Sequence, residues 1–184
     1  MPVKPMSCKE PTFYKEPAFR HAQASRTAVL LCNLGTPDAP TPSAVRRYLA
    51  EFLGDHRVVE IPQWIWKIIL HGIILRVRPA KSAAKYASIW TEQGSPLKVW
   101  TQAQAEGLQQ RFTQHHQDVT VRYAMRYGSP SIPSVLNELK AQGITRVLVF
   151  PAYPQYSGTT TASVFDAVYR WALKTRSVSY THLT

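Results

Sequence analysis

The stretch VLVFPAYPQYSGTTT, residues 147–161, decides the fold of this chain. Its first four residues are an apolar run that is typical of a buried strand in a parallel sheet. Apolar side chains recur at helical spacing over residues 162–173, so the loop leads into a helix. The prolines, tyrosines and hydroxyls therefore lie at the carboxyl end of a strand, where open α/β sheets bind ligands. Two alternatives fit the loop: a site for a large flat ligand, or a rigid turn with an N-cap at Ser157 or Thr159.

Strands and helices alternate along the rest of the chain. Two more strands are predicted at residues 27–33 and 119–124. Helices are predicted at residues 43–53 with Ser43 as the cap, at 63–77 ending before Pro79, and at 82–90, 97–112 and 131–142. This order predicts an α/β fold with a parallel sheet. Right-handed crossovers would place the three strand ends, NLGTP (33–37), MRYGSP (125–130) and AYPQYSGTTT (152–161), at one edge. An arginine and three tyrosines converge there, which favours a binding site over independent turns.

Composition limits the class of protein. The 184 residues suffice for one α/β domain, and the formal charge of +11 indicates an anionic partner or a merely basic surface. The basic residues are dispersed, so nucleic-acid binding is not expected. Cys8 and Cys32 form neither a disulfide framework nor a metal-ligand pattern, and Cys32 is predicted to be a core residue. We expect no secretory signal and no membrane span, and a cytoplasmic location.

Four motifs together carry a resemblance to a known family. They are LCNLGTPDAPTPSAVRRYLAEFLGDHRVVEIP (31–62), KYASIWTEQGSPL (85–97), MRYGSP and YPQYS. In order and spacing they resemble ferrochelatase of the bacterial type, the lyase of haem biosynthesis that inserts ferrous iron into protoporphyrin IX. The resemblance covers about residues 27–175. It implies one of two similar Rossmann-like domains that enclose a porphyrin cleft, with protoporphyrin IX and ferrous iron as substrates.

The resemblance also assigns porphyrin-binding positions. They are Leu34, Arg78, Tyr86, Ser95, Arg126, Tyr127, Tyr153, Tyr156 and Ser157. The residue types suit the ligand, because arginine pairs with propionate carboxylates and aromatic rings pack on a flat π system. Two of these residues also have an ordinary structural interpretation. Tyr86 fits packing between helices, and Arg78 fits a cation that stabilises a helix C-terminus.

The family's catalytic histidine and its partner glutamate lie beyond this chain. The resemblance therefore assigns no catalytic residue, no metal ligand and no cofactor here, and the chain is expected to be inactive alone. The predicted organisation is a loose basic extension (1–26), the amino-terminal ferrochelatase domain (27–176) and an atypical tail (177–184) with foreign origin as one explanation. His182 in that tail is not read as the catalytic residue.

Residues 61–77, IPQWIWKIILHGIILRV, leave two alternatives open. Core packing is slightly favoured, because a helix is needed to cover the sheet. The second alternative is that residues 61–77 contact a membrane surface, which implies a peripheral location at the inner membrane.

Two alternative functions also stay open. One is a non-catalytic basic module that binds a polyanion or a membrane, and the other is a chelatase for another tetrapyrrole such as coproporphyrin or sirohydrochlorin. Polyanion binding would fall steeply with salt, whereas porphyrin stacking would not.

Overall fold

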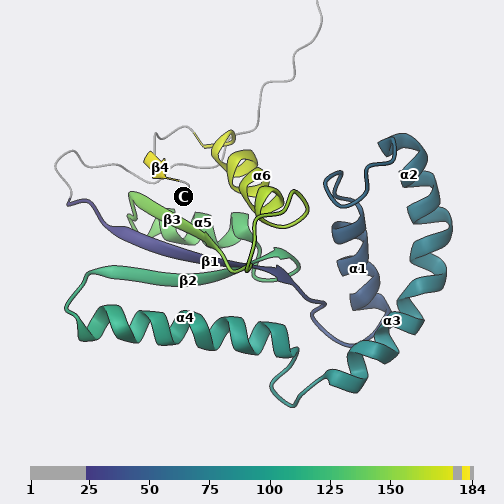
Figure 1. Cartoon of the computed structure of the whole chain (residues 1–184), viewed down its shortest axis with the longest axis horizontal. Coiled ribbons are helices and arrows are strands. Elements are labelled where there is room, and N and C mark those ends of the chain that lie inside the picture. Colours follow the sequence, from purple (N-terminus) through teal and green to yellow (C-terminus); the bar gives the residue numbers. More distant parts are fainter. Residues whose placement is uncertain (1–23, 176–179, 183–184) are drawn as a thin grey trace, which may run out of the picture.

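The computed structural model describes residues 24–175 and 180–182, and its frame is a sheet of four parallel strands (Figure 1). The strands are β1 (Thr27–Gly35), β2 (Val119–Tyr127), β3 (Arg146–Pro151) and β4 (Tyr180–His182), in the spatial order β2-β1-β3-β4. All three pairings are parallel, so the predicted α/β fold is confirmed. β4 lies in the stretch that the sequence analysis treated as an atypical tail. Most of the predicted extension, residues 1–23, lies outside the described residues.

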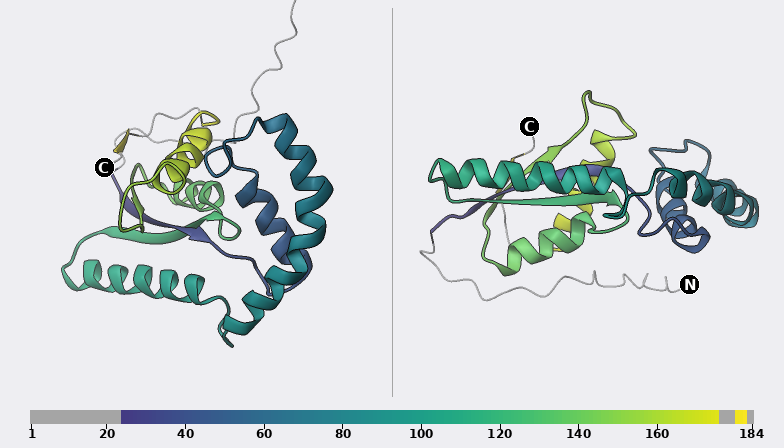
Figure 2. Two further views of the ribbon diagram at one scale, coloured as in Figure 1. Left: turned by 45° about the vertical axis from the view of Figure 1, so that its right-hand side comes forward. Right: turned by 90° about the horizontal axis from the view of Figure 1, so that it is seen from below.

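The central strand β1 is buried because helices cover both faces of the sheet. α4 (Pro96–Gln114) lies on one face, and α5 (Ile132–Ala141) and α6 (Thr161–Ala172) lie on the other (Figure 2). Alternate residues of β1 serve the two cores, with Leu30 and Cys32 toward α5 and α6 and Leu31 toward α4. Cys32 is a core residue as predicted, and burial raises the pKa of its thiol to about 12.

β3 is less buried than its apolar run predicts. Val149 is buried against α5 and α6, but Leu148 and Phe150 are 36% and 54% exposed. These two side chains point to the opposite face, where α4 packs on β2 and β1. The prediction of a buried strand is therefore wrong for one face of β3, because an apolar run does not reveal how far the covering helix extends.

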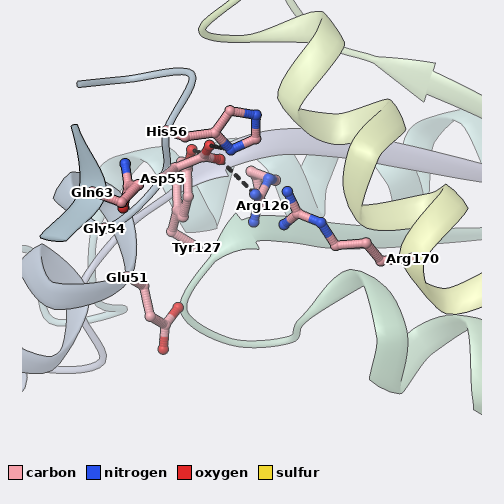
Figure 3. Close-up of a pocket in the computed structure, with 8 residues that line it drawn as sticks. All are labelled: Glu51, Gly54, Asp55, His56, Gln63, Arg126, Tyr127 and Arg170. Atoms are coloured by element: carbon pink, nitrogen blue, oxygen red, sulfur yellow. Dashed lines mark hydrogen bonds and ion pairs between the residues drawn. The ribbon is translucent and has the colours of Figure 1, made fainter. Parts of the chain in front are cut away.

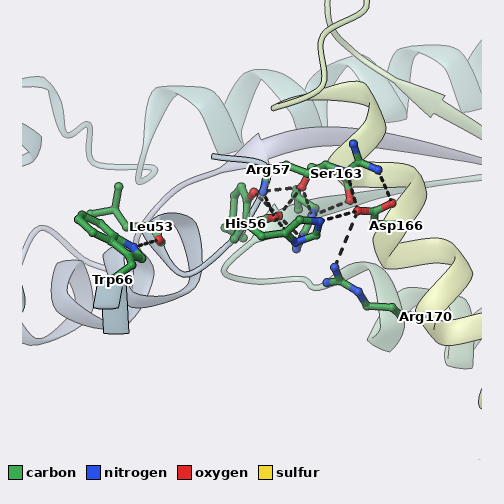
Figure 4. Close-up of polar contacts among 10 residues, drawn as sticks. Leu53, His56, Arg57, Trp66, Ser163, Asp166 and Arg170 are labelled. Carbon is green, nitrogen blue, oxygen red and sulfur yellow. Dashed lines mark hydrogen bonds and ion pairs between the residues drawn. The ribbon is translucent and has the colours of Figure 1, made fainter. Parts of the chain in front are cut away.

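A helical layer lies beyond the carboxyl end of β1. It contains α1 (Pro42–Leu53), α2 (Gln63–Ile69), a π-helical turn (Leu70–Ile74) and α3 (Leu75–Ile89). Figure 1 shows α1 between the sheet and the continuous helix formed by α2, the π turn and α3. That helix packs on α1 and does not cover the sheet, contrary to the reason given for favouring core packing of residues 61–77. The indole Nε1 of Trp66 donates to the carbonyl of Leu53 at 2.6 Å and joins α2 to the end of α1 (Figure 4).

The predicted break at Pro79 is wrong. Pro79 is buried inside α3, in a row with Leu75 and Ala83 that recurs every four residues and faces α1. Packing of the proline ring in this row offsets the backbone hydrogen bond that proline cannot donate. Across the π turn the row steps by five residues, from Leu70 to Leu75, which matches the wider turn of a π helix.

The cap predicted for α1 is wrong, and the structure does not show the N-cap that one of the two alternatives for the loop before α6 included. Thr41, not Ser43, caps α1, since its hydroxyl accepts a hydrogen bond from the N–H of Ala44 at 3.4 Å. α6 begins without a side-chain cap. Ser157 and Thr159 instead bond to each other within the preceding loop, where the hydroxyl of Ser157 accepts from the N–H of Thr159 at 3.3 Å.

Gly35 joins β1 to the site described below, and its replacement tests the fold. Gly35 has a φ of +107° and lies opposite Tyr127, whose carbonyl a Cβ at Gly35 would overlap. We expect Gly35→Ala to lower the free energy of unfolding by roughly 3 kcal/mol in urea denaturation. Gly72→Ala is the matched control, because a Cβ there meets no atom within 4 Å and should stabilise the helix by up to about 1 kcal/mol. Equal effects of the two changes would contradict the backbone argument.

Candidate functional site

Three strand ends meet at the carboxyl edge of the sheet, as predicted. Gly35 at the end of β1 pairs with Tyr127 at the end of β2, and the N–H of Ala152 after β3 donates to the carbonyl of Cys32 at 2.7 Å. The loops NLGTP, MRYGSP and AYPQYSGTTT therefore leave the sheet side by side, between the helical layer and α6.

A buried carboxylate joins the end of β2 to the first turn of α6. Asp55, in the loop after α1, is 7% exposed, and its Oδ2 accepts three hydrogen bonds. The donors are Nη2 of Arg126 at 2.6 Å, the hydroxyl of Tyr127 at 2.8 Å and the hydroxyl of Ser163 at 2.7 Å. Oδ1 accepts the backbone N–H of Arg57 at 2.9 Å. Both oxygens of the Asp55 carboxylate therefore accept hydrogen bonds from the protein, as expected for a buried polar group.

These contacts determine the charge of Asp55. Burial by itself would raise its pKa, but the hydrogen bonds from Ser163, Arg57 and Tyr127 and the charge of Arg126 outweigh burial and lower the pKa to about 2. The pKa of Tyr127 is raised to about 12, because burial and the neighbouring carboxylate outweigh the Ser163 hydrogen bond and the Arg126 charge. Asp55 is therefore ionised and Tyr127 neutral at pH 7.

A second ion pair holds the same loop against α6 (Figure 4). Arg57 donates to both oxygens of Asp166, at 2.6 and 3.0 Å. Arg170 lies 3.8 Å from Asp166, and Nε2 of His56 lies 4.0 Å from it. A hydrogen bond from Arg57 is the main cause of the lowered pKa of Asp166. The pair is bidentate, so it fixes the orientation of the loop as well as its position.

An open pocket of about 420 Å³ lies beside this network (Figure 3). Its lining residues come from the helical layer, from the end of β2 and from α6. They are Glu51, Gly54, Asp55, His56, Gln63, Arg126, Tyr127 and Arg170.

Two predicted site residues belong to this network. The side chain of Arg126 is 12% exposed, and its Nε donates to the carbonyl and the hydroxyl of Ser163 at 2.8 and 2.7 Å. Its guanidinium also lies 4.5 Å from the ring centroid of Tyr127. Tyr127 is 1% exposed, so in this structure its ring supports Arg126 and packs edge-on against Phe52.

Four predicted residues lie on or beside the helical layer. Leu34 and Tyr86 pack in the same apolar cluster as Tyr127. Ser95 is buried and accepts a hydrogen bond from the hydroxyl of Thr36 at 2.8 Å, which joins the GSP turn to NLGTP. Arg78 is exposed on α3 and makes no hydrogen bond or ion pair with the described part of the chain.

The last three predicted residues lie in the loop after β3. Tyr153 is half-buried, and its hydroxyl is buried without a hydrogen-bond partner among the described residues. Tyr156 is 73% exposed. Ser157 is half-buried and bonds within the loop. The structure thus brings Arg126 and Tyr127 together with the pocket and places Leu34 and Tyr86 in one cluster, while the side chains of Arg78 and Tyr156 are exposed.

Sequence reasoning missed the residues that hold the site together. Asp55, Ser163 and Asp166 were not singled out, although Asp55 lies within the quoted motif FLGDHRVV. Asp55 follows the glycine that ends α1, so an acidic residue directly after a helix end, in a chain with only 11 acidic residues, was the available signal. Nothing in the local sequence indicated Ser163, which is 108 residues away from its partner.

Comparison with known proteins gives a consistent match. A model of the Ferrochelatase family matches residues 26–183. The chain is 67% identical over 171 residues to a ferrochelatase of Polaromonas sp., which covers 91% of this chain and 47% of that protein. It is 64% identical over 163 residues to a ferrochelatase of Methylibium petroleiphilum (89% and 45%) and 59% identical over 167 residues to one of Herminiimonas arsenicoxydans (91% and 45%). The chain therefore spans about half the length of the curated relatives it matches, and corresponds to their amino-terminal half.

Replacement of Asp55 tests the network. Asp55→Asn leaves Arg126 buried without its counter-charge and turns amide hydrogens toward existing donors, so we expect a loss of roughly 3–5 kcal/mol in the free energy of unfolding. Folding lowers the pKa of Asp55 from 3.8 to about 2. Its stabilising contribution is therefore complete above about pH 4 and is lost as the pH falls toward 2.

Urea denaturation at several pH values measures both effects. The variant should lose less stability than the parent between pH 4 and pH 2. Asp38→Asn is the control, because Asp38 is exposed and 3.8 Å from Arg47, and it should cost under about 0.5 kcal/mol. An Asp55→Asn variant as stable as this control would disprove the role of the carboxylate.

Proposed function

The chain belongs to the ferrochelatase family, and from this premise we propose that it forms one wall of a porphyrin cleft in an enzyme that inserts ferrous iron into protoporphyrin IX. The reaction class is a lyase of haem biosynthesis, with iron as a substrate and no resident cofactor in this chain. The observation that carries the proposal is the meeting of NLGTP, MRYGSP and YPQYS at the carboxyl edge of the sheet, where parallel α/β sheets bind ligands.

Different residues bind different parts of the porphyrin, which is a flat ring system with two negative charges. Leu34 and Tyr86 offer apolar and aromatic surface at the helical layer. Arg78, exposed and unpaired within the described residues, is free to pair with a propionate. Arg126 is held by Asp55 and Ser163 in one orientation, so a ligand meets a cation that needs no rearrangement.

Proton removal from the pyrrole nitrogens requires a base that the family resemblance places outside this chain. Within residues 24–175 and 180–182 no group of three or more His, Cys, Asp or Glu side chains could hold a metal ion. We therefore propose that the chain by itself binds porphyrin weakly and inserts no metal at an appreciable rate.

Porphyrin fluorescence with the purified chain tests binding. Titration should give saturable binding that weakens far less with salt than polyanion binding would, since salt screens only the propionate contacts and not the apolar stacking. Arg78→Gln should weaken binding about tenfold through loss of one charge-assisted contact. Arg76→Gln, which removes the same charge from a neighbouring exposed position on α3, should have little effect.

Three outcomes would contradict parts of this proposal. A steep fall of binding with salt would favour a polyanion-binding module. Tighter binding of coproporphyrin than of protoporphyrin would favour another tetrapyrrole as substrate. Insertion of ferrous iron or zinc by the chain alone would place the base within these residues.

We also propose a cytoplasmic location with contact at the inner membrane, through an apolar face of α2 and α3. Trp64, Ile68, Ile73 and Val77 are between 59% and 71% exposed. They step by four, five and four residues, and the step of five spans the π turn, so all four lie on one side of the helix.

No acidic residue occurs between Glu60 and Glu92, while five lysines and arginines do. An apolar face flanked by cations fits an anionic lipid surface. None of the helices in the described residues is long and apolar enough to cross a membrane.

Flotation with vesicles tests this contact. We expect the chain to float with vesicles that contain about one-third anionic lipid and not with neutral ones. The double change Trp64→Ser and Ile68→Ser should reduce the floating fraction by a factor of about ten or more, since two large apolar side chains leave the interface. Leu173→Ser, at a residue that is 77% exposed at the end of α6, is the control. Equal retention of both variants would contradict the proposed surface.

A further inference from the structure

One face of β3 carries large apolar side chains that the described residues leave exposed. The strand alternates between two faces, and Val147 and Val149 pack with the core under α5 and α6. Leu148 and Phe150 lie on the other face, the side of the sheet on which α4 packs, and both are exposed. Strands of a parallel sheet are ordinarily buried on both faces, so an apolar surface at this place indicates a further covering element.

The direction of the crossovers explains why this face is open. A right-handed crossover places its helix on one face when the chain moves one way along the sheet, and on the opposite face when it moves back. In the order β2-β1-β3-β4, the step from β1 to β2 places α4 over those two strands. The steps to β3 and β4 run the other way, so α5 and α6 lie together on the opposite face (Figure 2). None of the crossovers between the described strands can therefore cover β3 on the side of α4.

One flank of α4 borders this open face. The hydroxyl of Thr101 accepts a hydrogen bond from Asn33 of β1 at 3.0 Å, and the side-chain amide of Gln109 bonds to the backbone of β2 at 2.7 and 3.0 Å. The helix positions on the other side of Thr101 therefore face β3. They are Leu97, Trp100, Gln104, Gly107 and Arg111.

This flank has room for a neighbour. Leu97 and Trp100 are 37% and 68% exposed. A Cβ placed at Gly107 would meet no atom of the described residues within 4 Å. A second helix could therefore lie beside α4, with its apolar side on Phe150 and Leu148.

Charge divides the open face into two ends. Because α4 runs antiparallel to the strands, Leu97 and Trp100 lie toward the carboxyl edge of the sheet with Phe150, whereas Arg111 lies toward the amino edge with Arg146. Both arginines are exposed, and neither pairs with a carboxylate in the described part of the chain. A partner with an apolar stripe and acidic residues near one end is complementary to this face.

Three sources of such a partner can be compared. Residues 1–23 contain four lysines and arginines against two glutamates, so they carry the same sign of charge as Arg111 and Arg146. A second copy of the chain would place one cationic face against another across a two-fold axis. The third source is the carboxyl-terminal half of the curated relatives, which the chain does not match. This half is the source that charge does not oppose.

We propose that the open face of β3 and α4 binds an amphipathic helix from the carboxyl-terminal half that the longer relatives possess. Its apolar stripe covers Phe150 and Trp100, and acidic residues near its end pair with Arg111 and Arg146. Gly107 lets the axes of this helix and α4 approach to roughly 8 Å. The surface lies on a face of the sheet and not at the edge where the motif loops meet, so the proposal is independent of porphyrin binding.

Photo-crosslinking identifies what covers the face. The full chain is co-expressed with the carboxyl-terminal half of the Polaromonas sp. ferrochelatase, and photoreactive benzoylphenylalanine replaces Phe150. We expect crosslinks to that half at positions about three or four residues apart, as one side of a helix requires. The same group in place of Tyr169, which is 53% exposed on α6, is the matched control and should give none. Crosslinks from position 150 to residues 1–23 or to a second copy, or none to the carboxyl-terminal half, would overturn the proposal.

Co-purification measures the contact independently. Phe150→Glu and, separately, Trp100→Glu should each lower the amount of the carboxyl-terminal half that co-purifies with the tagged chain about tenfold, because each change buries an unpaired carboxylate in the interface. Both side chains are more than half exposed, so the chain should fold with either change, which circular dichroism checks. Tyr169→Glu is the control and should co-purify as the parent does. Equal amounts with all three variants would contradict the proposed surface, whatever the porphyrin titration gives.

Discussion

The carboxylate of Asp55 joins three segments that lie far apart in the chain. It accepts hydrogen bonds from Arg126 and Tyr127 at the end of β2 and from Ser163 in the first turn of α6, while its own backbone belongs to the loop after α1. Removal of a carboxylate from water is costly unless all of its partners are in place. The end of α1, the end of β2 and the start of α6 are therefore held as one unit, and the loop with Asp55 keeps its position only in their presence.

The rest of the site follows from that unit. The helical layer covers the carboxyl edge of the sheet because the loop that leaves α1 is bound to α6, by Asp55 and again by the Arg57–Asp166 pair. The edge then has an aromatic side at the helical layer, with Leu34 and Tyr86, and a polar side toward α6, with Arg126 and Arg170.

Much of the fold could be predicted from periodicity. The apolar run at 147–150, the helical spacing after residue 161 and the glycines that end helices placed all three predicted strands and the helices that surround them. The failures share one cause. Pro79 stays inside a helix because its ring packs on α1, and Leu148 and Phe150 are exposed because α4 lies over the other strands. Both depend on neighbours that a local pattern does not include.

The sequence by itself determined most of the strands and helices, that the sheet is parallel, and that three motif loops leave it at one edge, because these features follow from side-chain periodicity and the handedness of crossovers. It also determined the family, through motifs in a fixed order. The tertiary structure alone decided which side chains hold charge at that edge. Asp55 pairs with Arg126 across 71 residues and with Ser163 across 108, and the strength of such a pair comes from burial that exists only once the layers have packed.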